Sequence, residues 1–396
     1  MNNGRQVMIM SGVRTAIGDY GGALKDVPPT ELAAHAIREA VKRANLEARQ
    51  VEQIVVGNVI HTEAKDMYLS RVACIRAGLP QETTALTVNR LCGSGMQAIV
   101  SAAQAIQLGD ADVAVGGGTE SMSRGAYLLP SLRWCQRMNA AGAIDMMVGA
   151  LTDPFDTVHM GITAENLAER WKIAREQQDE FAVESHRRAL NAIEKGYFKE
   201  QIVPIELKTR KGTTVVDRDE HPRADASLEG MAKLRAAFKK DGTVTAGNAS
   251  GINDGAAAVV LMEQDAANKA GLKPMAQLVS YGLAGVDPSI MGIGPVPACQ
   301  RALGKAGLTV ADMDVIESNE AFAVQALAVS CDLKFDPKKT NPNGGAVALG
   351  HPIGATGAVL TVKALYELQR VGGRYALVTM CIGGGQGIAA VFERVR

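Results

Sequence analysis

The sequence has no excess of charge of either sign and few aromatic residues. Lys and Arg number 42, Asp and Glu number 42, and aromatic residues make up 4% of the 396 residues. A net charge of zero argues against a dedicated nucleic-acid binder or a polybasic membrane surface. No run of about 18 apolar residues occurs, which excludes an apolar membrane-spanning helix. We therefore expect neither nucleic acid nor a membrane as a partner.

The six cysteines form no C-x-x-C pair and no regular spacing. A disulfide scaffold or a metal site is therefore not expected. The apolar run Val7–Met10 is too short for a signal peptide, and the C-terminus carries no peroxisomal tripeptide. These features predict a reduced, cytoplasmic protein. Four of the cysteines lack notable surroundings and are interpreted as packing residues, namely Cys74, Cys135, Cys299 and Cys331.

Glycine is abundant instead. The chain has 42 glycines, against about 28 expected from average usage. Glycine allows backbone to approach backbone or a ligand closely. Seventeen of the glycines fall in the segments 93–95, 116–118, 247–255, 344–357 and 383–387. We expect the backbone of these segments, interpreted as loops, to bind the ligand.

Apolar runs and helical patterns alternate along the chain. Val7–Met10 predicts a first strand, and an apolar stripe over residues 32–41 predicts a helix with Thr30 as its N-cap. This alternation is typical of an α/β fold with a mostly parallel sheet. Further elements are predicted as strands at 54–57, 85–91 and 113–115 and as a helix at 95–108.

The second half of the chain repeats the first at an offset of 262 residues, which pairs Ile54 with Ile316 and Gly95 with Gly357. One offset that holds across many residues indicates an internal duplication. Chance agreement between similar α/β units is the alternative.

Between the halves, residues 121–245 are richer in charge and in long helical patterns. We interpret them as an inserted domain that covers a site built by the two halves. The alternative is that this segment is a surface insertion that makes no contact with the functional site. The expected fold is therefore α/β, with duplicated βαβ-type core halves of mostly parallel sheets layered with helices, plus an inserted loop domain. The expected boundaries are 1–120 for the N-terminal half, 121–249 for the insert, 250–271 for the return to that half and 272–396 for the C-terminal half.

Cys92 is the first candidate for chemistry. It lies between a predicted strand end and a predicted helix start, flanked by Gly93 and Gly95. Backbone N–H groups and the dipole at a helix N-terminus stabilise a thiolate and lower its pKa. Free N–H groups at this place can also hold an oxyanion. A small buried hydrophobic residue is the alternative.

Three further segments place polar residues near strand ends. His351 lies in a glycine-dense turn at the topological place that Cys92 occupies in the first half, which favours a Cys–His pair over an ordinary polar residue. Cys381 precedes four glycines, and Asn319 follows an apolar strand. Asn319 is interpreted either as a hydrogen-bonding residue of the site or as a helix cap.

Four motifs in this order resemble those of the thiolase family. They are N-R-L-C-G-S-G around Cys92, N-E-A-F from Asn319, G-H-P-I-G-A-T-G around His351 and C-I-G-G-G-Q-G from Cys381. The resemblance covers essentially the whole chain and is strongest to the bacterial acetyl-CoA acetyltransferase and β-ketothiolase branch. It implies the thiolase fold and ping-pong chemistry, in which acyl-CoA molecules condense or a 3-oxoacyl-CoA is cleaved.

The resemblance also implies a role for each of these residues. Cys92 would carry the acyl group as a thioester, and His351 would take its proton. Cys381 would move the proton at C2 of acetyl-CoA, a task that suits a thiol. Asn319 would hold a water that forms one oxyanion hole with His351, and the N–H groups of Cys92 and Gly383 would form the other.

Coenzyme A is implied as substrate and product, with no permanently bound cofactor and no metal. It would lie between the insert and the core, with Arg223 at its nucleotide end and Met and Phe side chains along its pantetheine arm. The residues that the resemblance assigns to CoA are His159, Met160, Arg223, Met231, Phe238, Ala246, Ala249, Ser250, Ala321 and Phe322. The chain departs from the family at Gly230, Ala236 and Ser318, where Ser, Pro and Ala are usual.

Other functions remain open at this point. A degradative thiolase for longer 3-oxoacyl-CoA or for 3-oxoadipyl-CoA is the close alternative. A non-catalytic acyl-CoA carrier would not need Cys92, His351 and Cys381 together. A carrier-protein-dependent condensing enzyme would use a Cys-His-His or Cys-His-Asn set, which the second cysteine argues against. Relatives form dimers that assemble into tetramers, so a homo-oligomer is expected.

Overall fold

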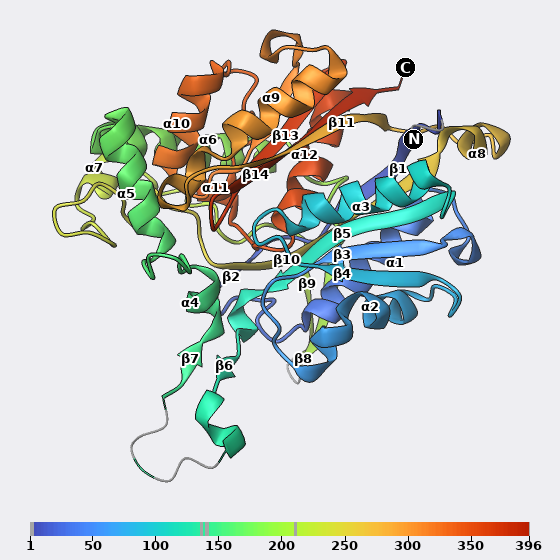
Figure 1. Ribbon diagram of the computed structural model, residues 1–396, viewed down its shortest axis with the longest axis horizontal. Helices are drawn as coiled ribbons and strands as arrows, with labels where there is room; N and C mark the ends of the chain where they lie inside the picture. The colour runs from blue at the N-terminus through green and yellow to red at the C-terminus, as the bar shows by residue number, and fades with distance from the viewer. Residues whose placement is uncertain (1–3, 135–137, 139–141, 210–211, 396) are drawn as a thin grey trace.

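The structure is a computed structural model that describes residues 4–134, 138, 142–209 and 212–395. Its centre is a sheet of ten strands in the order β12-β13-β14-β11-β1-β10-β5-β3-β4, with β2 paired to β10. Helices cover this sheet (Figure 1). The strands are β1 (Val7–Arg14), β2 (Gly18–Asp19), β3 (Gln53–Gly57), β4 (Thr84–Val88), β5 (Val113–Ser121), β10 (Asn253–Glu263), β11 (Ala276–Gly285), β12 (Val315–Ser318), β13 (Tyr375–Ile382) and β14 (Gln386–Arg394).

The two halves of the sheet repeat each other. The order β1-β10-β5-β3 of the first half is matched by β11-β14-β13-β12 in the second. The offset of 262 carries β3 onto β12, α3 (Ser94–Leu108) onto α12 (Thr356–Arg370) and β5 onto β13, to within one residue at each end. The halves join where Met8 pairs with Gln277 and Ile9 with Ala276. The predicted α/β class and duplication are confirmed.

The sheet is mixed in direction. β3 pairs in parallel with β4 and β5, and β12 with β13, and these pairs are connected through helices. The central strands β1, β10, β11 and β14 pair antiparallel with their neighbours. β14 follows β13 through a tight turn and β10 returns from the insert, so neither is connected by the crossover that a parallel pair requires. This refines the predicted sheet.

Several element boundaries differ from the predicted ones. Helix α1 (Pro29–Arg43) has Pro28 as its N-cap, and Thr30 lies inside the first turn. The prediction of Thr30 as N-cap is wrong because Pro29, with its fixed φ, begins the helix two residues earlier than a Thr30 cap would. The strand predicted at 85–91 ends at Val88, and the one predicted at 113–115 continues to Ser121.

Helices α3 and α12 pack against each other and against strands of both halves. Glycine allows their close contact: a Cβ on Gly95 would lie 2.7 Å from the Ala358 nitrogen, and one on Gly357 would overlap the Met96 nitrogen. The two contacts are equivalent under the duplication. Glycines 116–118 also lie inside β5 and not in a loop, because α3 and the turn after His351 approach that strand.

We expect Gly95→Ala to destabilise the protein by about 2 kcal/mol, because an added methyl would force α3 and α12 apart and overpacking of this kind costs about 1–3 kcal/mol. Chemical denaturation would measure the loss. Gly304→Ala is the matched control, since Gly304 lies in helix α9 (Pro295–Ala306) with no atom within 4 Å of its added Cβ. The control should gain up to about 1 kcal/mol. Equal effects of the two substitutions would contradict this packing.

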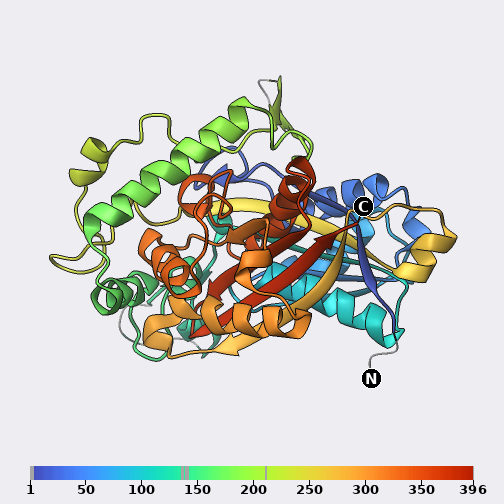
Figure 2. The same ribbon diagram turned by 90° about the horizontal axis from the view of Figure 1, so that it is seen from above.

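The segment between the halves contains the long helix α6 (Arg175–Glu194), which runs along one side of the molecule (Figure 2). Arg14 of β1 pairs with Asp219 of this segment through bonds of 2.7 and 2.9 Å, with both side chains fully buried. Asp219 also accepts the Ile17 N–H at 2.8 Å. These bonds fix the chain before Arg223 against the core.

The remaining elements are short or peripheral. None of the helices in the described part of the chain is both long and apolar enough to cross a membrane. Cys135, interpreted as a packing residue, lies outside the described residues. These remaining helices and strands are α2 (Leu69–Ala77), α4 (Met146–Ala150), α5 (Met160–Trp171), α7 (Leu228–Ala232), α8 (Gln264–Lys269), α10 (Ala323–Leu333), α11 (Ala346–Leu349), β6 (Tyr127–Leu128), β7 (Ile144–Asp145), β8 (Ile205–Thr209) and β9 (Gly212–Val216).

Candidate active site

Cys92 lies in a strained turn between β4 and α3. Leu91 before it has a φ of 45°, which a bulky residue rarely adopts. Ser94 Oγ accepts the Arg90 N–H at 2.8 Å and donates to the Leu91 carbonyl at 2.7 Å. Asn89 Oδ1 accepts the Leu91 N–H at 2.9 Å. Strain of this kind concentrates at functional sites, and here it holds Cys92, partly exposed, beside the N-terminus of α3.

The surroundings of the Cys92 thiol shift its pKa in opposite directions. Burial raises its pKa to about 11, although the backbone N–H groups of Gly383 and Cys92 itself favour the thiolate. Glu120 raises the pKa further. The predicted lowering of the Cys92 pKa is therefore wrong, because the loss of water around the sulfur outweighs the N–H donors.

The hydrogen bonds of His351 define its tautomer. The Thr356 hydroxyl lies 2.6 Å from His351 Nδ1 and donates to the Pro352 carbonyl at 3.0 Å. It therefore accepts from Nδ1, which carries the proton. Nε2 is left as a proton acceptor, and Asn319 Nδ2 lies 3.4 Å from it. The His351 backbone N–H donates to Asn253 Oδ1 at 2.9 Å, which fixes the turn.

Burial lowers the pKa of His351 to about 4. Because burial also raises the pKa of Cys92, the neutral thiol and neutral imidazole are favoured over a thiolate–imidazolium pair. No hydrogen bond joins the Cys92 sulfur to His351 among the residues that the structure describes. A reaction at the Cys92 sulfur would therefore first have to remove the thiol proton, and the neutral imidazole of His351 could accept a proton at Nε2.

Cys381 and Gly383 lie at the end of β13, next to the Cys92 turn. A Cβ on Gly93 would lie 2.6 Å from Ile382 Cδ1, so the turn packs directly on this strand end. Cys381 is fully buried, and its pKa is raised by burial first and by Cys92 second. The fold thus brings together the two cysteines and the Gly383 N–H from opposite halves of the chain.

Glu120, at the end of β5, is a buried residue that no motif singled out. Its carboxylate accepts the Asn58 side-chain amide at 2.9 Å and the N–H groups of Val59, Ile60 and Gly354 at 3.2, 3.0 and 2.8 Å. Burial raises the pKa of Glu120 to about 8 against these donors. Gly354 belongs to the His351 turn, so Glu120 fixes that turn to the first half. The one sequence feature that could have indicated Glu120 as a site residue is the position of an acidic residue at the end of an apolar, glycine-rich strand.

Two adjoining cavities lie beside these groups. The first, of about 410 Å³, reaches His351, and the second, of about 290 Å³, contains Arg223. Ala246 lines both. Of the residues assigned to CoA from the sequence, the first cavity is lined by His159, Phe238, Ala246, Ala249, Ser250 and Phe322, and the second by Arg223, Met231 and Ala246.

Met160 and Ala321 lie outside both linings. Met160 packs behind Gly383, whose added Cβ would lie 2.7 Å from Met160 Cε. The Ala321 carbonyl accepts the Ser250 N–H at 3.0 Å. Ala321 therefore supports Ser250, a wall residue of the first cavity, whereas Met160 packs against the strand end that carries Gly383.

Stacked rings form one wall of the first cavity. His159 stacks on Phe238 with ring centroids 4.5 Å apart, and Phe238 meets Phe322 edge-on at 6.1 Å. A Cβ on Gly161 would overlap the Phe238 ring, which explains the glycine. Such a wall suits a narrow, mostly apolar arm with a few polar groups.

Comparisons with known proteins match both halves. The model of the thiolase N-terminal domain matches residues 7–265 and that of the thiolase C-terminal domain matches residues 272–394. The chain belongs to the thiolase family. It is 64% identical to β-ketothiolase BktB of Cupriavidus necator over 99% of this chain and 100% of the relative. This thiolase is an acyl-CoA C-acyltransferase.

Solved structures agree in fold. The acetyl-CoA acetyltransferase of Bacillus anthracis has a TM-score of 0.97 at 48% identity, covering 99% of both chains. Human mitochondrial 3-ketoacyl-CoA thiolase in complex with CoA has a TM-score of 0.95 at 45% identity, covering 99% of this chain and 98% of that one. The thiolase fold predicted from the motifs is confirmed.

The departures from the family lie at the margin of this thiolase's site. Gly230 lines the second cavity, where its N–H donates to Ser227 Oγ at 3.2 Å. Ser318 is buried, and its hydroxyl has no hydrogen-bond partner in the described chain. Nothing in the structure explains Ala236. No cluster of three or more His, Cys, Asp or Glu suited to a metal ion occurs within the described ranges.

Proposed function

We propose that this thiolase condenses acetyl-CoA with short acyl-CoA, and cleaves short-chain 3-oxoacyl-CoA in reverse, through a thioester on Cys92. The observation that carries the proposal is that the Cys92 turn, at the N-terminus of α3, packs directly on the strand end that carries Cys381 and Gly383, where a Cβ on Gly93 would lie 2.6 Å from Ile382 Cδ1. The backbone N–H groups of Cys92 and Gly383 are the proposed donors at this place. A thioester formed at this sulfur would place its carbonyl oxygen near both donors.

In the first half-reaction the Cys92 sulfur attacks the acyl-CoA carbonyl. Nε2 of His351 accepts the thiol proton and returns it to the departing CoA sulfur. The oxygen that becomes negative is stabilised by the N–H groups of Cys92 and Gly383, and loss of one such donor costs about 10²–10³ in rate.

In the second half-reaction Cys381 moves a proton at C2 of acetyl-CoA. For condensation the thiolate form of Cys381 removes that proton, and the carbanion attacks the carbonyl of the Cys92 thioester. The C–S bond to Cys92 breaks, and the released sulfur takes up the proton held by Cys381. Thiolysis runs in the reverse order: Cys92 attacks the 3-oxo carbon first, and Cys381 gives its proton to C2 of the departing acetyl-CoA as the C–C bond breaks. A second CoA then takes the acyl group from Cys92. Asn319 and His351 stabilise the enolate oxygen, with Asn319 acting through a water.

CoA is proposed as substrate and product, with no resident cofactor or metal. The first cavity suits its pantetheine arm and the second suits its nucleotide end, where Arg223 supplies positive charge. We propose residues 121–249 as the CoA-binding insert between core halves formed by 1–120 with 250–271 and by 272–396. Human mitochondrial 3-ketoacyl-CoA thiolase, a relative solved in complex with CoA, supports CoA as the ligand.

A chain-length series tests the proposal. We expect acetoacetyl-CoA and 3-oxohexanoyl-CoA to be cleaved with ping-pong kinetics, and 3-oxoadipyl-CoA to be cleaved far more slowly. Mass spectrometry after incubation with acetyl-CoA should show one acetyl group on Cys92. A marked preference for 3-oxoadipyl-CoA or for long chains would favour a degradative thiolase. Absence of both the adduct and turnover would favour an acyl-CoA carrier.

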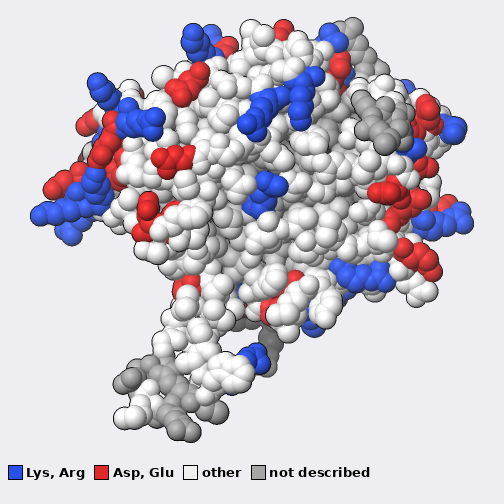
Figure 3. Space-filling model, viewed as in Figure 1, with Lys and Arg blue, Asp and Glu red and all other residues white. Residues whose placement is uncertain are grey.

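We also propose a cytoplasmic homo-oligomer, a dimer of dimers. β4 is an edge strand with a half-exposed Leu86, and edge strands pair readily with another chain. The arm that carries β6 and β7 projects from the body and is mostly free of charge in Figure 3. Trp134 on this arm is 84% exposed.

Five free cysteines among the described residues fit a reducing compartment.

A further inference from the structure

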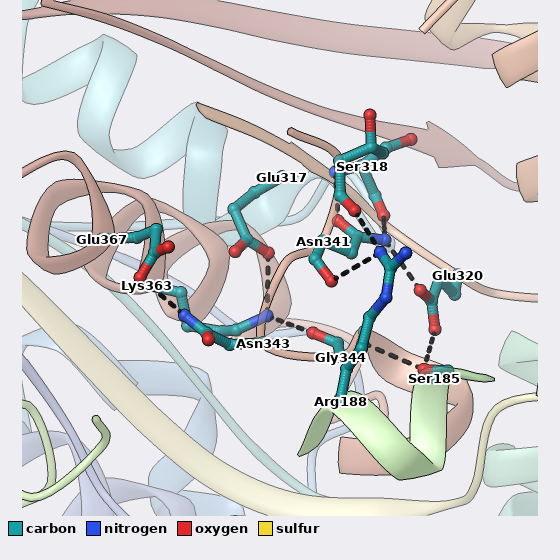
Figure 4. A network of polar contacts seen from close by, with 12 residues as sticks. Ser185, Arg188, Glu317, Ser318, Glu320, Asn341, Asn343, Gly344, Lys363 and Glu367 are labelled. Carbon is teal, nitrogen blue, oxygen red and sulfur yellow. Dashed lines mark hydrogen bonds and ion pairs between the residues drawn. The ribbon is translucent and has the colours of Figure 1, made fainter. Parts of the chain in front are cut away.

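Behind Asn319 lies a buried carboxylate, Glu320, that no step above uses. It accepts hydrogen bonds from Ser185 Oγ and Asn341 Nδ2, both at 2.7 Å (Figure 4). It also accepts the Val347 N–H at 3.2 Å. Burial raises the pKa of this carboxyl, and all three partners oppose that rise because each donates to it. The side-chain amide nitrogen of its neighbour Asn319 lies 3.4 Å from His351 Nε2.

Glu320 ties together three segments that are distant in sequence. It belongs to the Asn319 loop, Val347 belongs to helix α11 directly before His351, and Ser185 belongs to helix α6 of the insert. Ser185 Oγ also accepts the Gly345 N–H at 3.0 Å. The loops that carry Asn319 and His351 are thus held by one carboxylate and one hydroxyl.

A second set of bonds fixes α6 to the same place. Arg188 donates to the carbonyls of Thr340 and Asn341 at 2.8 and 3.3 Å. Asn341 in turn accepts the Ser318 N–H at 2.9 Å and donates to the Ser318 carbonyl at 2.8 Å (Figure 4). A displacement of α6 would therefore be transmitted through these hydrogen bonds to the end of β12, which precedes Asn319.

The same helix borders the second cavity. His186, which follows Ser185, lines that cavity and accepts the Arg223 N–H at 3.1 Å through Nδ1. Val347 lines it as well. Of the groups that hold Glu320, Ser185 is thus adjacent in sequence to His186 of the proposed nucleotide site, and Val347 itself lines that site.

We propose that Glu320 is a positioning residue that sets the separation of Asn319 and His351, and that Ser185 links it to the nucleotide site. This inference rests on the proposed function. A CoA nucleotide seated against His186 and Val347 would hold Ser185 and Glu320 in place and so raise kcat, beyond its contribution to binding. Interactions remote from the reacting atoms contribute to catalysis in this way when they are coupled to it.

Two thioesters test the link, acetoacetyl-CoA and acetoacetyl-pantetheine, which lacks the nucleotide. We expect Ser185→Ala to lower kcat on acetoacetyl-CoA about tenfold with little change in KM, and to leave kcat on acetoacetyl-pantetheine nearly unchanged. Ser185→Thr, which keeps the hydroxyl, should restore the acetoacetyl-CoA value. Equal losses on both thioesters, or none on either, would overturn the link to the nucleotide.

Glu320→Gln tests the positioning role. Its amide N–H would face one of the three donors, and we expect kcat to fall about 10²-fold on both thioesters, as for a misplacement of about 1 Å. Unchanged kcat on both would overturn this role. If Glu320→Gln does not fold, Glu320→Asp, which keeps the charge, replaces it with the same expected direction.

Arg187→Gln is the control on the same helix. Arg187 is exposed and pairs with Glu184, and its loss should leave both rates at the wild-type value. A tenfold loss of kcat on acetoacetyl-CoA in Arg187→Gln would show that any substitution in α6 lowers this rate. That result would overturn the specific role of Ser185. Failure of the proposed function is a separate result, because wild-type protein would then not cleave acetoacetyl-CoA at all.

Discussion

Replacement of Cys92 by serine should lower thiolysis and condensation by about 10⁴–10⁶-fold, the range found when a nucleophile or its partner is removed from a catalytic set. The physical reason is that a hydroxyl is a far weaker nucleophile than a thiol and is harder to deprotonate by a neutral imidazole. Incubation with labelled acetyl-CoA followed by mass spectrometry should show no acetyl group on residue 92.

Cys331→Ser is the control for this substitution, because Cys331 is an exposed free cysteine of helix α10. It should keep wild-type acylation and turnover. If Cys92→Ser still accumulated a covalent acetyl group at the wild-type level, the assignment of the nucleophile would be wrong. Retention of CoA binding by Cys92→Ser would show that the loss is chemical.

Residues that share a local motif were predictable from the sequence. Cys92, His351 and Cys381 each stand beside glycines near a predicted strand end, and the duplication placed Cys92 and His351 at matching positions in the two halves. The structure places the Cys92 turn against the strand end that carries Cys381 and Gly383. Patterns of this kind are local, so one sequence is sufficient to show them.

Properties that depend on packing were not predictable. The sign of the Cys92 pKa shift depends on how much water the fold removes, and the dipole argument alone gave the wrong direction. The roles of Glu120 and Glu320 depend on donors from distant segments, such as Gly354 and Ser185. Antiparallel central strands were missed because strand direction follows from connections, while a buried strand has the same composition in either direction.

Cys381→Ser should abolish C–C bond chemistry while acylation of Cys92 continues. General acid–base groups contribute about 10²–10⁴ in rate, so acetoacetyl-CoA formation and cleavage should fall by that factor. Acylation requires Cys92, His351 and the N–H donors but moves no proton at C2. Exchange of labelled CoA into acetyl-CoA, which reports acylation alone, should therefore stay within about twofold of wild type.

The contrast between the two assays separates a catalytic role of Cys381 from a packing role. Burial raises the pKa of Cys381, which favours the neutral thiol that the proposed proton donation in thiolysis needs. Cys299 is buried in the same apolar cluster, with its pKa also raised by burial, to about 12. Cys299→Ser should therefore impose a similar packing change yet leave the ratio of condensation to exchange unchanged. If Cys381→Ser lost exchange with its fold intact, or if both variants changed the ratio equally, Cys381 would not be the group that moves the proton at C2.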